Sequence, residues 1–540
     1  MRGDRSISHE VQKSIRPSTE TASVVEGKCD SIAVVVADRA GSRRRKSWGG
    51  RTFRFSLQSF LPGKGLFLRR FSVVEAALLL MMALLASRGL GVVRQSIFNA
   101  LFGTGPEANA YYAALRLPDT LFNLIAGGAL VHAFIPVLLS YEKERGELEV
   151  WRLTSLVFNV LLVLTAVLLI IGEFLTPAFV NHLLVPGYSP TEQALTASLT
   201  RIMLVQPLIL GLGTIAMAVL NGKRQFMLPA ASIAIYNIGM IAGLLITLAI
   251  PKAGIYGPTY GVLIAAILQV GIQIPGLVRQ RVRYEFVWDL RHPGLRQVMR
   301  LLTPNALAIG IFYIGTIADT AFSSYLPDAA GLSALHNAQM LQAVPLALMS
   351  QAIGQALLPH LSVQAASNHY MRMTQTALKV MGVSILLAVP AAIVLAVAGK
   401  PVIHLLFQHG AFTQHSTDVT NLALLGYAVG VPGLVAGDLI VRGFYALKDA
   451  WTPLWTNIFA LLSRVSLIIL LLQLLKGPLV ILAIPLALAG SASAEAVLLC
   501  VLLFYRLRKR ITLDKGMQRL QRRRFYQKRQ QEKEDFQSIR

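Results

Sequence analysis

Apolar residues in this chain come in long uninterrupted runs instead of alternating with polar ones. A helix needs about 20 mostly apolar residues to cross the hydrocarbon core of a bilayer, and runs of that length recur along most of the sequence. The pattern predicts an all-α polytopic membrane protein with about twelve transmembrane helices. The expected spans lie near residues 73–103, 108–140, 153–175, 193–220, 226–250, 257–278, 298–325, 331–361, 375–397, 417–441, 453–474 and 479–505.

The low share of charged residues supports the same class. Only 14% of the 540 residues are charged and 54% are apolar, whereas soluble domains carry about 25% charged residues. The two cysteines, Cys29 and Cys500, have no metal-ligand partner at useful spacing. No nucleophile–base arrangement, metal cluster or glycine-rich phosphate loop stands out. The sequence therefore predicts neither a metal site, nor a cofactor, nor an enzyme.

Much of the formal net charge of +24 lies in two flanking segments, residues 43–70 and 506–529. Basic segments beside membrane helices usually set topology and bind anionic lipid, and no nucleic-acid recognition fold accompanies them. Nucleic acid is therefore not an expected partner. Residues 1–70 are rich in Ser, Arg and Gly without a sustained apolar period. That composition predicts a disordered tail and not a signal peptide.

Every second loop between the expected spans is basic, which predicts the orientation of the chain. The basic loops include residues 143–152, 223–224 and 279–296, whereas the loops between them hold mainly single lysines such as Lys252 and Lys400. The positive-inside rule places the basic loops and both termini in the cytoplasm. An even number of spans brings both termini to the same side, as this orientation requires.

Short matches between the two halves of the chain share one sequence offset. The His-Leu-Leu at 182–184 recurs at 404–406, and residues 221–229 recur loosely as 446–453, an offset of roughly 222 to 227 residues. Six spans separate the copies, which predicts two six-helix lobes related by a parallel pseudo-repeat. Transporters often bind substrate at such an interface. The expected parts are a disordered basic cytoplasmic tail at 1–70, an N-lobe at 71–285, a C-lobe at 286–508 and a basic cytoplasmic tail at 509–540.

Two arginines, Arg88 and Arg94, lie in the first expected span with apolar residues before and after them. Six helical residues rotate the chain by about 600°, so the two side chains point within about 120° of each other. Both can then line one cavity, or one or both can extend to a headgroup region. A guanidinium group matches phosphate oxygens in a bidentate manner, so an arginine pair in a cavity favours an anionic ligand.

Other polar residues inside the expected spans leave alternatives open. Asp319 is a candidate ion-coupling carboxylate, or else the partner of a hydroxyl or an arginine. Arg464 and Glu495 are expected to form a structural pair or to be satisfied polar sites. Asp438 and Arg442 have the four-residue spacing of an intrahelical ion pair. A further group either faces the space between the lobes or makes interhelical hydrogen bonds: Asn123, His132, His336, Asn337, Gln339 and Gln342.

Several segments together resemble the MurJ/MviN family of lipid II flippases, within the multidrug/oligosaccharidyl-lipid/polysaccharide exporter superfamily. The resemblance covers roughly residues 73 to 505. Its most specific parts are residues 87–94 (SRGLGVVR) and 443–453 (GFYALKDAWTP), and residues 110–118, 133–136, 357–359 and 408–412 also fit. The family's second-helix arginine falls here on Phe122 or Asn123, its eighth-helix arginine falls near Met340, and Asn109 stands where an acidic residue is common. Two further C-terminal helices found in many members do not follow the twelfth expected span.

The resemblance implies two lobes around a central cavity that opens alternately to each side of the bacterial cytoplasmic (inner) membrane. The implied cargo is a polyprenyl-diphosphate-linked disaccharide-pentapeptide, the lipid II precursor of peptidoglycan and the cell wall. Arg88 and Arg94 match two family arginines that engage the diphosphate, and Asn123 is a third substrate-binding candidate. Asp319 is near an acidic position that some members link to sodium.

Three alternatives to lipid II transport stay open at this point. The cargo can be another polyprenyl-linked glycan, or a small molecule exported by the same superfamily. The chain can also be a non-transporting membrane scaffold that recruits cell-wall enzymes through its basic tails. Sodium, protons or the membrane potential can supply the energy for transport. Besides its cargo and membrane lipids no partner is expected, and the protein is predicted to be a monomer.

Overall fold

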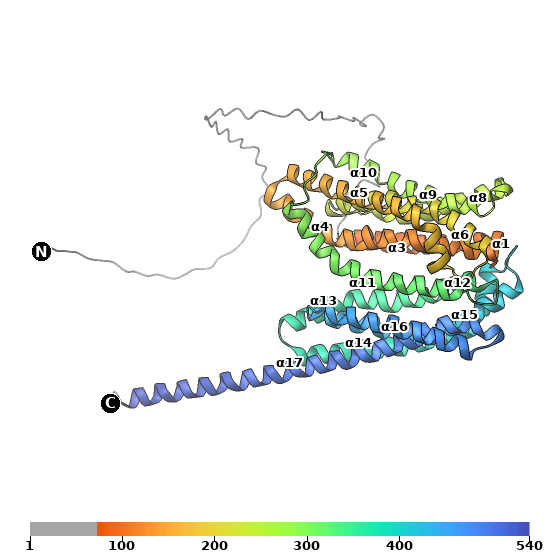
Figure 1. Cartoon of the computed structure of the whole chain (residues 1–540). Helices are drawn as coiled ribbons and strands as arrows, with labels where there is room; N and C mark the ends of the chain where they lie inside the picture. The colour runs from red at the N-terminus through yellow and green to blue at the C-terminus, as the bar shows by residue number, and fades with distance from the viewer. Residues whose placement is uncertain (1–72, 539–540) are drawn as a thin grey trace, which may run out of the picture. The chain divides into compact units, whose positions relative to one another are not determined.

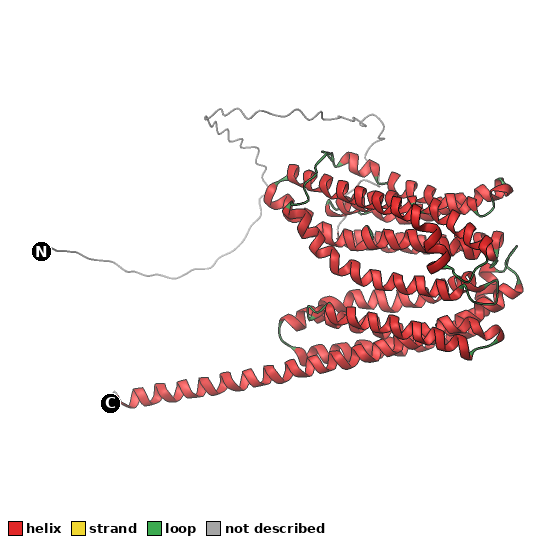
Figure 2. Ribbon diagram, in the orientation of Figure 1, coloured by secondary structure: helices red, strands yellow, loops and turns green. Residues whose placement is uncertain are grey.

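The computed structural model describes residues 73–538 of the chain, and its regular elements there are all helical (Figures 1 and 2). The predicted tail at 1–70 lies outside the described residues. The first half contains α1 (Val73–Phe102), α2 (Pro106–Ala114), α3 (Arg116–Ile125), α4 (Gly128–Arg145), α5 (Glu147–Phe179), η2 (Val180–Leu184), α6 (Pro190–Met203), α7 (Val205–Gly222), α8 (Met227–Ala249), η3 (Pro251–Ala253), α9 (Tyr256–Gly271) and α10 (Ile274–Arg279).

The second half contains fewer and longer helices. They are α11 (Pro293–Ser323), α12 (Gly331–Leu346), η4 (Ala347–Gln351), α13 (Ala352–Ala366), α14 (Tyr370–Phe407), α15 (Gln414–Ala446), α16 (Trp451–Leu474), η5 (Gly477–Leu482) and α17 (Ala483–Ser538). The predicted basic tail at 509–540 therefore begins as a direct continuation of the last helix, as Figure 1 shows.

The all-helical membrane class predicted from the sequence is confirmed. Within residues 73–538, ten helical segments are long and apolar enough to cross a membrane. Each coincides with one of the expected spans. Two expected spans remain, 73–103 and 331–361. They correspond to α1 and to the series α12, η4 and α13, and these helices are not among the ten. The count of twelve therefore stays a prediction, as do the repeat and the lobe boundaries.

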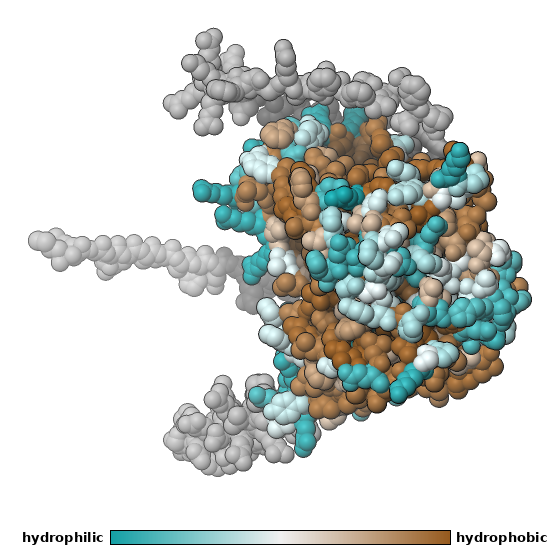
Figure 3. Space-filling view, turned by 45° about the vertical axis from the view of Figure 1, so that its right-hand side comes forward, coloured by the Kyte–Doolittle hydropathy of each residue, from teal (hydrophilic) through white to brown (hydrophobic). Residues whose placement is uncertain are grey.

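The outward-facing surface of many helices is apolar, as contact with lipid requires. Large apolar side chains such as Phe174, Leu386 and Val397 are 79%, 70% and 75% exposed. Soluble monomers rarely expose apolar patches of more than a few hundred Å². Figure 3 shows apolar side chains over much of the face that it presents. Exposed apolar side chains of this kind are those that a membrane-spanning protein presents to lipid.

The second expected span is a chain of three helices, α2, α3 and α4, and not a single helix. The break before α4 occurs at Gly127, where a Cβ would lie 2.9 Å from the Asn123 backbone, so only glycine permits this turn. Pro118 lies in the first turn of α3, where its missing N–H leaves no helical hydrogen bond unmade. Asp119, in the first turn of α3, lines a cavity beside α1.

Segments from the two halves of the chain meet at one end of the helices. Gly103 and Gly410 have positive φ values of 59° and 58°, and each allows the backbone of the other half to approach closely. The Ala411 N–H donates to the Ala100 carbonyl at 2.8 Å. The Gly187 N–H donates to the Ser324 hydroxyl at 2.9 Å. The segments that follow α1, η2, α11 and α14 are thus joined to one another at this end.

Helix α11 packs against both halves. Near its start, Leu295, Val298 and Leu302 belong to the same buried cluster as α4 and α5. Farther along, Gly315 lies beside Leu461 and Arg464 of α16. This helix therefore links the two halves along its length, although the sequence assigns it to the C-lobe.

Candidate functional site

A polar cavity of about 230 Å³ lies beside α1. Helices α1, α2, α3, α8 and α12 supply its polar side chains, while Leu244 and Pro258 complete one apolar wall. Such a group of charged and aromatic side chains inside membrane-spanning helices is costly to bury and marks a functional site. Its polar lining consists of Arg94, Gln95, Tyr111, Tyr112, Asp119, Tyr236 and His336.

Arg94 is held in this cavity by contacts with α8. Its Nη1 donates to the Sδ of Met240 at 2.9 Å and to the Oδ1 of Asn237 at 3.4 Å. The Asn237 amide donates in turn to the Ser87 hydroxyl at 2.9 Å, and Gly91 leaves room for Asn237 at 3.7 Å. The 87–94 segment therefore positions its last arginine through a single asparagine on α8. Neutral partners leave the charge of Arg94 available to a ligand.

Arg116 and Asp119 add a second cation and a carboxylate to the same region. The Arg116 Nε donates to the Thr320 hydroxyl of α11 at 3.0 Å. Asp119 lines the cavity, and it lies within the electrostatic range of both Arg94 and Arg116. Neither residue was among the site residues predicted from the sequence. The signal was nevertheless present, since two ionisable residues three positions apart lie inside an expected apolar span.

Asp319 forms an ion pair with Arg464. Of the two partners that the sequence left open for Asp319, a hydroxyl or an arginine, the structure has the arginine. The Arg464 Nη2 donates to the Asp319 Oδ2, joining α11 to α16. Both side chains are largely buried, at 13% exposure for Asp319 and 11% for Arg464. The Asp319 Oδ1 has no hydrogen-bond partner among the described residues. Arg116 also acts on this carboxylate electrostatically, so the pair is close to the cavity cations.

Of the two alternatives for Arg464 and Glu495, a structural pair or satisfied polar sites, the pair is wrong. Arg464 is taken by Asp319 on α11, whereas Glu495 lies near Thr456. The intrahelical pair of Asp438 and Arg442 is confirmed at 3.0 Å. Hydropathy identifies which residues enter the membrane but not which helices are neighbours. A pair within one helix follows from spacing alone, whereas a pair between helices does not.

A cluster of buried amides joins α1 to α12 beside the cavity. The Gln95 Nε2 donates to the Tyr112 hydroxyl at 2.5 Å and to the Asn337 Oδ1 at 2.8 Å. The Asn99 Nδ2 donates to the same Asn337 oxygen at 3.0 Å. Nearby, the Asn109 Oδ1 accepts from the Ser333 N–H at 2.8 Å. These side chains, together with Asn109, connect the two halves of the chain near the joined ends.

Of the four predicted site residues, only Arg94 lines this cavity. Arg88 is exposed, and Asn123 is half-buried, with its amide donating to the Asp119 carbonyl within α3 at 2.9 Å. Asp319 belongs to the neighbouring ion pair with Arg464. The structure thus separates the arginines that the sequence placed together. The two side chains point about 120° apart around α1, and only Arg94 faces α8.

The charges in and beside the cavity favour an anionic ligand. Three guanidinium groups, of Arg94, Arg116 and Arg464, act on this region together with the two carboxylates of Asp119 and Asp319, which leaves a net positive charge. Among residues 73–538, no group of three His, Cys, Asp or Glu side chains is placed to hold a metal ion. The arrangement can therefore bind and orient an anion through arginine side chains.

The helical arrangement and the cavity define a multi-pass membrane transporter. A solved inward-facing multidrug resistance MATE family transporter of the MOP superfamily has the same fold, with a TM-score of 0.67 at 12% identity, over 81% of this chain and 99% of that one. A solved lipid II flippase MurJ in an inward closed conformation matches with a TM-score of 0.67 at 25% identity, over 78% of this chain and 86% of that one.

Sequence comparison is more specific than the fold. A family profile described as lipid II flippase MurJ matches residues 98–523. The lipid II flippase MurJ of Burkholderia cenocepacia is 30% identical over 378 residues, covering 68% of this chain and 72% of the relative. A probable lipid II flippase MurJ of Rhizobium meliloti is 29% identical over 420 residues, covering 77% and 76%. The chain belongs to the lipid II flippase MurJ family.

Proposed function

We propose that this protein is a flippase that moves lipid II from the inner to the outer leaflet of the bacterial cytoplasmic membrane. The observation that carries the proposal is the cavity with Arg94 and Asp119, with Arg116 beside them, inside a member of the MurJ family. The basic loops favour an orientation with both termini in the cytoplasm. Transport moves a molecule across the bilayer and changes no covalent bond in it, so no catalytic residue is required.

The cavity arginines would bind the diphosphate of the cargo. Arg94 now donates to a thioether and an amide oxygen, and a phosphate oxygen is a stronger acceptor than either. Arg116 now donates to a hydroxyl. Replacing these neutral partners by a diphosphate gives charge-assisted hydrogen bonds in a site where little water competes. Arg88 and Asn123 lie outside this cavity, and we propose that they contact the cargo in other stages of transport.

Transport requires the two halves to move relative to each other. A pocket for even a drug-sized ligand has a volume of about 300–1,000 Å³, so the 230 Å³ cavity is too small for a disaccharide-pentapeptide. The halves are joined at one end by amides such as Gln95, Asn99 and Asn337. Neutral hydrogen bonds contribute only about 0.5–1.5 kcal/mol each. This connection is therefore weak enough to open and re-form in an alternating-access cycle.

Asp319 stays our candidate for ion coupling. Arg464 holds one of its oxygens, while the other, Oδ1, has no hydrogen-bond partner among the described residues. A sodium ion or a proton can bind that oxygen, and the membrane potential can act on the negative cargo as well. The protein needs no bound cofactor in this scheme and is proposed to work as a monomer.

A complementation experiment tests the proposed function. The gene replaces the resident flippase of a host in which that flippase can be depleted, and growth and exposure of lipid II on the outer leaflet are followed. We expect rescue by the wild type and by Arg296→Ala, whose arginine is exposed outside the cavity. We expect no rescue by the Arg94→Ala/Arg116→Ala double variant. Rescue by the double variant at wild-type expression would refute the role of the cavity.

A further inference from the structure

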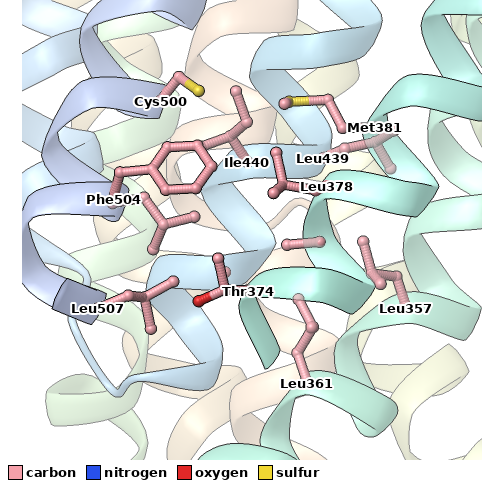
Figure 4. Close-up of a pocket in the computed structure, with 13 residues that line it drawn as sticks. Leu357, Leu361, Thr374, Leu378, Met381, Leu439, Ile440, Cys500, Phe504 and Leu507 are labelled. Atoms are coloured by element: carbon pink, nitrogen blue, oxygen red, sulfur yellow. The ribbon is translucent and has the colours of Figure 1, made fainter. Parts of the chain in front are cut away.

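A second hollow, separate from the polar cavity, is an apolar cleft between α14 and α17 (Figure 4). Leu378 of α14 and Phe504 of α17 face each other across it, Ile440 of α15 forms the floor, and Leu361 of α13 closes one side. The one hydroxyl in the lining, that of Thr374, already donates to the Tyr370 carbonyl at 2.9 Å. The lining therefore presents hydrocarbon, and its free volume of about 20 Å³ is too small for a whole acyl chain, so a chain can lie only along the open side.

Close packing of α17 on α15 explains why the cleft exists. A Cβ on Gly443 would lie 2.9 Å from Leu503 Cδ2, so the glycine allows the two helices to approach closely. Helix α14 packs on α15 as well, since Met373 of α14 belongs to the same buried cluster as Leu439 and Ile440 of α15. The two helices thus contact α15 on either side of the cleft. Leu378 at the opening is 42% exposed.

The cleft reaches the level at which the membrane ends and basic residues begin. On α17 the apolar run ends at Tyr505, and Arg506, Arg508, Lys509 and Arg510 follow. Leu507, between these arginines, still lines the cleft. The basic residues that follow on α17 lie just beyond the lining of the cleft, at the headgroup level of the predicted cytoplasmic leaflet.

Arg510 is the cation at the end of the cleft. Its guanidinium lies over the Tyr370 ring, 5.5 Å from the centroid, and its Nη1 donates to the Tyr370 hydroxyl at 3.4 Å. Tyr370 begins the helical turn that leads to Thr374 in the cleft. These described partners of Arg510 are neutral. By contrast, Arg506 is paired with the Asp449 carboxylate, so Arg510 is the better phosphate ligand.

We propose that this cleft binds one anionic phospholipid from the surrounding bilayer, with an acyl chain along its open side at Leu378 and the phosphate at Arg510. The apolar lining takes a hydrocarbon chain, and the cation at its end takes a negative headgroup. Basic pockets between membrane helices on the cytoplasmic side bind acidic lipid headgroups by this chemistry. The site lies apart from the polar cavity and from the diphosphate ligands proposed there.

Native mass spectrometry of the full-length protein in detergent tests this site. The protein is titrated with phosphatidylglycerol and with phosphatidylcholine that carries the same acyl chains. For the wild type we expect one tightly bound phosphatidylglycerol and weaker binding of phosphatidylcholine. Arg510→Gln should lower the affinity for phosphatidylglycerol about fivefold and leave phosphatidylcholine unchanged. Arg508→Gln, on the same exposed helix end but without the Tyr370 contact, is the matched control and should keep the preference.

A second pair of variants tests the acyl-chain part of the cleft. Leu378→Trp fills the opening at a partly exposed position and should abolish tight binding of both lipids. Leu386→Trp, at a 70% exposed position of the same helix outside the cleft, should leave binding unchanged. Equal affinity of the wild type for the two lipids, or unchanged binding by Leu378→Trp, would overturn the proposal. Displacement of phosphatidylglycerol by equimolar polyprenyl phosphate would also overturn it, by assigning the cleft to the cargo chain.

Discussion

The polar cavity beside α1 and the apolar cleft between α14 and α17 suit opposite kinds of ligand group. The cavity gathers Arg94 and Asp119, with Arg116 beside them. The cleft presents almost only hydrocarbon and keeps its cation, Arg510, at the end. An amphiphile has an ionic part and an apolar part, and each hollow is complementary to one of them. The difference teaches that the groups suited to an ionic headgroup and those suited to a hydrocarbon chain lie in separate parts of this fold.

The largest expected effect comes from removing the cavity charges. We expect Arg94→Ala combined with Arg116→Ala to lower lipid II transport by about 100-fold or more, since a hydrogen bond to a charged group contributes about 1.5–3 kcal/mol. The rate of lipid II exposure in vesicles that contain purified protein measures it. Each single variant should be intermediate. Wild-type transport by the double variant would show that the cavity arginines do not bind the cargo.

Breaking the ion pair of Asp319 and Arg464 has the next largest effect, and it falls on stability. Arg464→Leu leaves a buried carboxylate without its partner, a change that costs about 3–5 kcal/mol. The double variant Asp319→Asn/Arg464→Leu should recover most of this loss, because no uncompensated charge remains. Thermal unfolding of the purified protein in detergent measures both.

The same double variant separates two roles of Asp319. If Asp319 couples transport to an ion, the variant should be stable yet have lost any dependence on a sodium or proton gradient. Transport that keeps its gradient dependence in this variant would assign coupling elsewhere. The pair would then be structural, and the functional charges would be confined to the cavity.

The fold was largely predictable because hydropathy acts on whole helices. The expected spans 226–250 and 453–474 match α8 (Met227–Ala249) and α16 (Trp451–Leu474) within a residue or two. The breaks in the second span were not predicted. They depend on the close approach of Gly127 to Asn123, which an apolar run containing two glycines does not reveal.

The site was predicted only in part, because it is built between helices. Arg94 was found from the 87–94 segment, but its partner Asn237 is distant in sequence. Arg464 was assigned to the wrong carboxylate for the same reason. The apolar cleft gives no sequence signal at all. Its lining looks like any lipid-facing surface until α14 and α17 are placed on either side of α15.

An intermediate effect is expected at the amide cluster that joins the halves near the cavity. Asn337→Ala removes the oxygen that accepts from both Gln95 and Asn99. Neutral hydrogen bonds contribute about 1 kcal/mol each, so the loss of two should shift the equilibrium about 30-fold toward states in which this end is open. Distance distributions between spin labels on the segments after α1 and α14 report the shift. Gln339→Ala, half-buried on the same helix, is the control and should leave the distribution unchanged.

The smallest effect on transport is expected at the cleft. A lipid along the open side of the cleft contacts helices of one half of the chain, so its loss should lower the stability of that half and leave the cavity unchanged. We expect Leu378→Trp to transport lipid II within about twofold of the wild type, because the transport charges are intact. The rise in unfolding temperature on addition of phosphatidylglycerol should disappear in this variant, since a ligand stabilises only the state that binds it. Loss of transport in a stable Leu378→Trp protein would contradict the separation of cargo binding at the cavity from phospholipid binding at the cleft. It would show that the cleft takes part in moving the cargo.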